Sequence, residues 1–215
     1  MRDLIIVCAG GFGRDVQQII ENINLKAERL GRERPYRLLG FIDDTRTTLK
    51  DKNLDVPILG TIRDWQPQGD ERYVMANATP RHKQMLAEML KARGARFETL
   101  ICLQTQEKLP DNVKIGEGCI ITPYTLDQNT TVGDFVNLQS CAIGQDSVIG
   151  DYCTVTAFAN VTAHMGKRVF VGSHAVVLNH RKIGDDAVIG ACSLVLNPVK
   201  AGSKVFGVPA KSIDL

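Results

Sequence analysis

The chain has 215 residues, of which 44% are hydrophobic and 23% are charged, a composition typical of a soluble globular protein. Its formal net charge is +2 and its Lys and Arg residues form no long run, so neither nucleic acid nor an anionic membrane is expected as the main partner. No apolar segment approaches the roughly 20 residues that cross a bilayer, so no membrane insertion is expected.

Residues 1–102 predict an α/β domain with a Rossmann-like parallel sheet. Short apolar runs that suit buried strands alternate with segments of helical spacing. The first run ends in the glycines of "GGFG", and the second, "YRLLGFIDD", ends in two acids. We expect strands over 3–9, 36–44, 56–60, 72–77 and 95–101, and helices over 14–30 and 80–94.

From about Val113 the helical signal stops and aliphatic–glycine pairs recur. A six-residue unit with one aliphatic suits a short strand and a turn, and three units make one triangular coil with the aliphatic pointing to its axis. The small residue that follows would fit a tight corner. Period six is unbroken over Met165, Val171, Val177, Ile183, Ile189 and Val195.

The repeat loses register in three places. The distances from residue 115 to 132 and from 132 to 143 are each one residue short of a whole number of repeats. The distance from residue 149 to 165 is two residues short of three repeats. Such slips mark distorted corners or loops.

Six cysteines are scattered along the chain, and no two of them form a C-x-x-C pair. This spacing gives no support to a zinc or redox motif. We expect reduced, mostly buried thiols and a cytoplasmic protein that holds no metal.

The chain resembles the hexapeptide-repeat sugar O-/N-acyltransferases, which include sialic acid O-acetyltransferase-like proteins and N-acetyltransferases of nucleotide-linked amino sugars. The resemblance implies a nucleotide-sugar-binding domain over residues 1–102 and a left-handed parallel β-helix over residues 103–215. It also implies a homotrimer, with acetyl-CoA as cosubstrate in the groove between neighbouring β-helices. The segments that carry it, in the order found in the family, are "CAGGFGRDV", "GFIDD", "IGQDSVIGDYC", "GDDAVIGACSLV" and "VFGVPAK".

The resemblance places the nucleotide-sugar at Gly10, Gly11 and Phe12, and at Asp43 and Asp44 after the second strand. Backbone N–H groups at a helix N-terminus can hold a phosphate, and a carboxylate at a strand end can accept bonds from a ribose or base. A glycine turn that merely closes a βα unit, with solvated acids, is the alternative.

The resemblance places acetyl-CoA at Ser173 and Ala191. The two are 18 residues apart, which would stack them on adjacent coils, where small side chains let a pantetheine arm approach the backbone. The ordinary need of a corner for small residues explains them equally well.

Gln145 and Asp146 stand where the family carries His followed by an acid. A Gln amide oxygen accepts a hydrogen bond but takes no proton at physiological pH, so it cannot act as a general base. Three interpretations stay open: an N-acyltransferase that needs no side-chain base, a base relocated to His164 about one coil later, and a binding protein without catalysis.

A metalloenzyme of the carbonic anhydrase type, which also carries hexapeptide repeats, needs three converging histidines. His164, His174 and His180 are spaced by ten and six residues, and we expect no pair of them one coil apart. This spacing does not favour such a metal site.

The function expected from the resemblance is acyl transfer from acetyl-CoA to the amino group of a nucleotide-linked sugar for surface polysaccharide synthesis. Sugar O-acetylation and a non-catalytic nucleotide-sugar-binding homologue are the alternatives.

Overall fold

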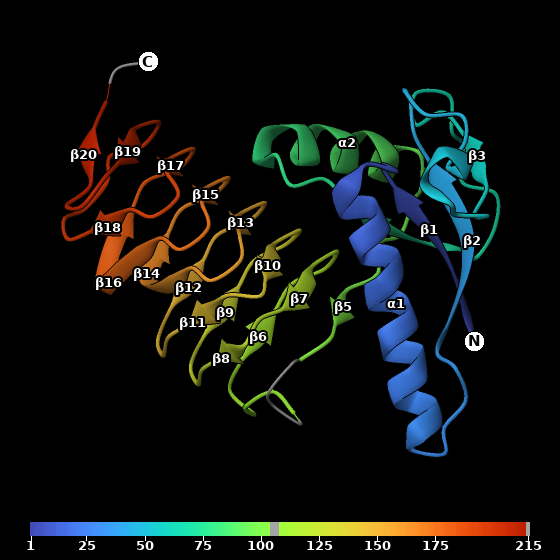
Figure 1. Ribbon diagram of the computed structural model, residues 1–215, viewed down its shortest axis with the longest axis horizontal. Coiled ribbons are helices and arrows are strands. Elements are labelled where there is room, and N and C mark those ends of the chain that lie inside the picture. The colour runs from blue at the N-terminus through green and yellow to red at the C-terminus, as the bar shows by residue number, and fades with distance from the viewer. Residues whose placement is uncertain (104–107, 214–215) are drawn as a thin grey trace. The chain divides into compact units, whose positions relative to one another are not determined.

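The computed structural model describes residues 1–103 and 108–213, and the chain divides into two compact units (Figure 1). The first comprises Met1–Ala78 and His82–Leu100, and the second comprises Thr79–Arg81 and Ile101–Leu215. None of the helices in the described ranges is long and apolar enough to cross a membrane.

The first unit contains a parallel sheet with strand order β3-β2-β1-β4. Residues 4–7 of the central strand are all buried, because neighbours cover both faces of a parallel sheet. The Rossmann-like sheet expected from the sequence is confirmed. The helices and strands of this part of the chain are, in order, β1 (Arg2–Val7), α1 (Gly11–Arg29), β2 (Tyr36–Ile42), η1 (Lys50–Lys52), β3 (Ile58–Gly60), β4 (Arg72–Met75) and α2 (Pro80–Ala92).

The strand expected over 95–101 does not join this sheet as predicted. Phe97 forms only an isolated bridge with Tyr73, and the chain then leaves the sheet. Leu100–Ile101 forms β5, which pairs in the second unit, and the Cys102 N–H donates to the Ile121 carbonyl at 2.9 Å. A short apolar segment pairs equally well with either sheet, so its pattern could not decide between them.

The second unit is a parallel β-solenoid, which Figure 1 shows as successive coils. Two of its faces form sheets with strand orders β20-β19-β17-β15-β13-β10-β7-β5 and β18-β16-β14-β12-β9-β6. The strands are β6 (Lys114–Ile115), β7 (Ile120–Thr122), β8 (Thr125–Leu126), β9 (Thr131–Val132), β10 (Asn137–Gln139), β11 (Ala142–Ile143), β12 (Val148–Ile149), β13 (Thr154–Val155), β14 (Asn160–Met165), β15 (Phe170–Val171), β16 (Val176–Ile183), β17 (Val188–Ile189), β18 (Leu194–Val195), β19 (Lys204–Phe206) and β20 (Lys211–Ser212).

The repeated aliphatics form the axis of the solenoid, as the period-six pattern predicts. All of them from Met165 to Val195 are at most 3% exposed and belong to one hydrophobic cluster. The fold expected from the hexapeptide repeats is therefore confirmed.

The glycines of the repeat allow neighbouring coils to stack closely. The sequence predicted that a small residue is needed there to fit a tight corner, but the structure shows that close stacking is the reason. A Cβ on Gly166 would lie 2.1 Å from Oδ1 of Asp185, and one on Gly150 would lie 2.4 Å from the Gly166 carbonyl oxygen. The left-handed corner conformation falls instead on non-glycine residues, such as Asp146 at φ 58° and His180 at φ 53°.

One corner of the solenoid is two residues short. In β14 the inward residues Val161 and Met165 are four positions apart, whereas β16 keeps six between Val177 and Ile183. The pairing of β14 with β16 consequently shifts register after Val161. We call this segment of β14, residues 162–164, the shortened corner; it is the two-residue slip seen in the sequence.

Candidate functional site

The glycine loop joins β1 to α1, as predicted. Gly10 is the N-cap of α1 and provides no side-chain cap, so the first N–H groups of the helix are left for other acceptors. Gly11 is exposed, and Gly10 and Phe12 are half-buried. Gly13, which sequence analysis missed, has no room for a side chain because a Cβ would lie 2.1 Å from the Cys8 carbonyl oxygen.

The Cys8 thiol beside this loop is not a nucleophile at neutral pH. Burial raises the pKa of Cys8 to about 11, and the nearby charge of Asp43 acts in the same direction. The thiol stays protonated, and the amide of Asn77 donates to its Sγ at 3.6 Å.

Asp43 holds the glycine loop in place. Its Oδ2 accepts the Ala9 N–H at 2.7 Å, and its Oδ1 accepts the N–H and hydroxyl of Thr45, both at 2.8 Å, and the Arg46 N–H at 2.9 Å. Burial alone would raise the pKa of Asp43, but these four hydrogen bonds outweigh it and hold that pKa below its ordinary value. Both carboxylate oxygens are thus engaged with the protein itself.

Asp44 differs from its neighbour in being exposed. Its Oδ1 accepts the Arg63 N–H at 2.9 Å. Its second oxygen has no partner among the residues that the structure describes. Of the two predicted acids, Asp44 is the one with acceptor capacity to offer a ligand.

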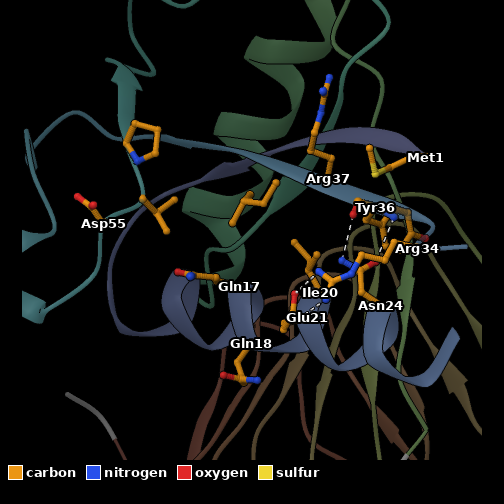
Figure 2. Close-up of a pocket in the computed structure, with 13 residues that line it drawn as sticks. Met1, Gln17, Gln18, Ile20, Glu21, Asn24, Arg34, Tyr36, Arg37 and Asp55 are labelled. Atoms are coloured by element: carbon orange, nitrogen blue, oxygen red, sulfur yellow. Dashed lines mark hydrogen bonds and ion pairs between the residues drawn. The ribbon is translucent and has the colours of Figure 1, made fainter. Parts of the chain in front are cut away.

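A separate cavity of about 540 Å³ lies along α1, beside the start of β2 and the segment that leads into β3 (Figure 2). Both of its arginines are paired: Arg34 lies 3.0 Å from Glu21, and Arg37 lies 2.5 Å from Asp3. Because the amino ends of the strands border it, this cavity is at the opposite edge of the sheet from the glycine loop. None of the predicted site residues lines it.

Gln145 and Asp146 form an exposed corner of the solenoid between β11 and β12. The buried Ser147 fixes this corner to the next coil: its hydroxyl donates to the Gly144 carbonyl at 2.7 Å and accepts the Ala163 N–H at 3.4 Å. A Cβ on Gly144 would lie 2.2 Å from the Thr162 hydroxyl oxygen. The Gln145 corner therefore sits directly against the shortened corner.

His164 lies at the end of the shortened corner and points outward. Its partners in register are Val148 of β12 and Lys182 of β16. Its ring centroid lies 5.8 Å from that of His180, with the two planes at 56°. The expectation that no two histidines lie one coil apart is therefore wrong, because it assumed coils of uniform length.

Ser173 and Ala191 lie on adjacent coils, as their spacing predicts. Their coils approach so closely that a Cβ on Gly172 would lie 2.5 Å from the Ala191 nitrogen. The Ser173 hydroxyl donates to Oγ1 of Thr156 at 3.2 Å. The next residue, His174, belongs to an aromatic ladder that sequence analysis missed: its ring stacks 5.0 Å from that of Phe158.

Within residues 1–103 and 108–213, no group of three or more His, Cys, Asp or Glu side chains is arranged to hold a metal ion. The remaining histidine, His82, belongs to α2, and its Nδ1 lies 3.0 Å from Nδ2 of Asn77 in the first unit.

Two domain families match the chain. Residues 3–90 match the PglD N-terminal domain, and residues 162–197 match the bacterial transferase hexapeptide repeat. The chain joins a PglD N-terminal domain to bacterial transferase hexapeptide repeats. The family resemblance drawn from the sequence is confirmed.

Solved structures with the same fold cover both units. The acetyltransferase domain of PglB from Neisseria gonorrhoeae is 18% identical, with a TM-score of 0.76 over 99% of this chain and 100% of that one. PerB from Caulobacter crescentus, in complex with CoA and GDP-perosamine, is 20% identical, with a TM-score of 0.73 over 100% and 98%. WeeI from Acinetobacter baumannii is 24% identical, with a TM-score of 0.75 over 99% and 100%. At these identities the likeness shows the fold.

A curated relative matches only a short segment. Serine acetyltransferase from Mycobacterium tuberculosis is 45% identical over 49 residues, which is 23% of this chain. The match spans about a fifth of that protein, 21% of its length.

Proposed function

We propose that the protein transfers an acyl group, acetyl from acetyl-CoA, to the amino group of a nucleotide-linked sugar in surface polysaccharide synthesis. The observation that carries this proposal is the union of a PglD N-terminal domain with transferase hexapeptide repeats in one chain. It is supported by a fold shared over both units with PerB, which was solved with CoA and GDP-perosamine. The acetyltransferase domain of PglB, with the same fold, was solved with acetyl coenzyme A.

The nucleotide-sugar is proposed to bind at the glycine loop. The N–H groups at the start of α1, which the side chain of the N-cap residue does not cap, suit a phosphate, and the exposed Asp44 suits a ribose or base donor. Asp43 supports this site by holding the Ala9 N–H, so its role is to position the loop.

Acetyl-CoA is proposed to bind along the coils of Ser173 and Ala191. These coils are in close contact and carry small side chains, which leaves the backbone accessible to a pantetheine arm. All six cysteines are free thiols, which suits the reducing cytoplasm that we propose as the location.

Transfer to nitrogen is favoured because Gln145 cannot take a proton. A neutral amine nitrogen attacks the thioester carbonyl carbon, the carbon–sulfur bond breaks, and the CoA thiolate accepts the proton that nitrogen loses. A hydroxyl is a far poorer nucleophile and needs activation. In this reaction Gln145 orients the amine or a water, with Asp146 beside it.

The test is a thiol-release assay with acetyl-CoA and a panel of nucleotide-linked amino and hydroxy sugars. We expect thiol release with amino sugars and a product that resists hydroxylamine, as an amide does. A hydroxylamine-labile product would instead assign sugar O-acetylation. Tight binding of a nucleotide-sugar without thiol release from any acceptor would assign the non-catalytic role.

A further inference from the structure

The contact between His164 and His180 is a feature of the solenoid that the assigned site residues do not explain. The ring centroids are 5.8 Å apart and both side chains are exposed. We propose that the two imidazoles act as one unit in acyl transfer, in which His164 takes the proton of the acceptor and His180 positions His164. This inference rests on the proposed acyl transfer, and it gives the proton a route through His164 in place of direct transfer to the CoA thiolate.

The pair exists because one corner lost two residues. A full corner carries a left-handed residue three positions before the inward aliphatic, as Asp146 does before Ile149 and His180 does before Ile183. The shortened corner of β14 has no such residue, so β14 and β16 change register between Val161 and Ala163. That shift brings the corner residue His180 beside His164, at the end of the shortened corner.

The shortened corner also lies against the Gln145 corner. Gly144 contacts Thr162, and the Ser147 hydroxyl joins the Gly144 carbonyl to the Ala163 N–H. Gln145 cannot take a proton, whereas the imidazoles of His164 and His180 can. The three residues thus lie on successive coils along the same edge of the solenoid. Among residues 1–103 and 108–213, no direct hydrogen bond joins Gln145 to His164, which leaves their polar atoms free for an acceptor.

The chemistry needs two properties that the pair supplies. A neutral imidazole has one ring nitrogen that can accept a proton and one that donates a hydrogen bond, and a neighbouring ring can limit how far the imidazole turns. Neither ring has a hydrogen-bond or ion-pair partner within the part of the chain that the structure describes, and Val148 and Lys182, the partners of His164 in register, provide no carboxylate. His180, whose ring centroid lies 5.8 Å from that of His164, is the group proposed to limit the orientation of His164 through this ring contact.

The proton balance follows from this arrangement. As the acceptor nitrogen attacks the thioester carbonyl carbon, its proton passes to the free ring nitrogen of His164. When the carbon–sulfur bond breaks, the imidazolium returns that proton to the CoA sulfur, which leaves as the thiol. The pair ends each turnover in its starting state, and no further reactant is needed.

The experiment compares His164→Gln, His180→Gln and the double variant in the full-length protein, with thiol release from acetyl-CoA as the readout. We expect kcat to fall about 100-fold in His164→Gln, as for loss of a general base, and about tenfold in His180→Gln, with KM for acetyl-CoA unchanged in both. The double variant should be no slower than His164→Gln. His82→Gln in α2 is the matched control and should keep the wild-type rate.

Chemical rescue separates proton transfer from a structural role. Added imidazole should restore turnover to His164→Ala and leave His82→Gln unchanged, while the thermal midpoints of all variants stay near that of the wild type. Two results would contradict the proposal that the histidines act as one unit: a wild-type turnover rate in His164→Gln, or a double variant whose loss of rate is the product of the two single losses. Either result would leave the proposed function intact. An inactive wild-type protein with every acceptor would overturn both.

Discussion

Gln145 occupies an exposed corner, and its amide cannot accept a proton. We expect Gln145→Ala to lower turnover only about tenfold, or ~1.4 kcal/mol, because it removes an orienting hydrogen bond. Loss of a true general base costs about 10²–10⁴-fold. Steady-state thiol release measures the difference, and a fall of a thousandfold with the fold intact would show that Gln145 does more than orient.

Asp43 and Asp44 are adjacent but differ in their contacts, so their alanine variants should have different effects on ligand binding and on stability. Asp44→Ala should weaken nucleotide-sugar binding and leave acetyl-CoA affinity nearly unchanged, because the exposed Asp44 accepts only one backbone N–H from the protein. Calorimetric titration of each ligand measures both affinities. Equal loss of both would indicate unfolding in place of a local contact.

Asp43→Ala should instead destabilise the first unit by about 1–3 kcal/mol, because it leaves the buried Ala9 N–H without its acceptor and removes the hydrogen bonds from Thr45. The folded-state pKa of Asp43 lies below its unfolded value, so its contribution is complete above the unfolded pKa and is lost as the pH falls through the folded one. Denaturant titrations at neutral and acidic pH should therefore show a smaller difference between wild type and variant in acid. A difference that grew in acid would contradict the lowered pKa.

At the scale of the elements, several glycines of the repeat lie where the next coil leaves no room for a side chain. Gly150→Ala should lower the free energy of unfolding by about 1–3 kcal/mol, because the new methyl would lie 2.4 Å from the backbone oxygen of Gly166. Gly69→Ala is the matched control, since its methyl would meet only the carboxylate end of Glu71 at 3.1 Å. Equal denaturation midpoints for the two variants would show that the coils can move apart at no cost.

The sequence predicted these elements where one local rule decides them. The buried aliphatics of the solenoid follow from period six alone, and β1 follows from a short apolar run. The destination of β5 could not be predicted, because Leu100 and Ile101 suit either sheet. The His164–His180 contact could not be predicted either, because it depends on how a shorter coil stacks on a longer one.

At the scale of the whole molecule, the solenoid exposes apolar side chains that a single copy leaves in water. Val148 is 42% exposed, Phe158 is 53% exposed and Leu196 is 41% exposed. We expect a homotrimer, in which neighbouring copies cover such residues around a threefold axis. Light scattering should give three times the mass of the chain, and a stable monomer would remove both the trimer and an acetyl-CoA groove between copies.

The antiparallel strand β20 has a consequence for polymerisation. A stack of parallel coils ends in a strand edge whose unpaired N–H and C=O groups could accept another copy end to end. Here β20 covers the edge of β19, with Val205 opposite Ser212 and Phe206 opposite Lys211. Because β20 is short, reversed in direction and carries an exposed lysine, it offers a poor template for further parallel coils. On this face of the solenoid, β20 therefore hinders the parallel hydrogen bonding from continuing onto a second copy.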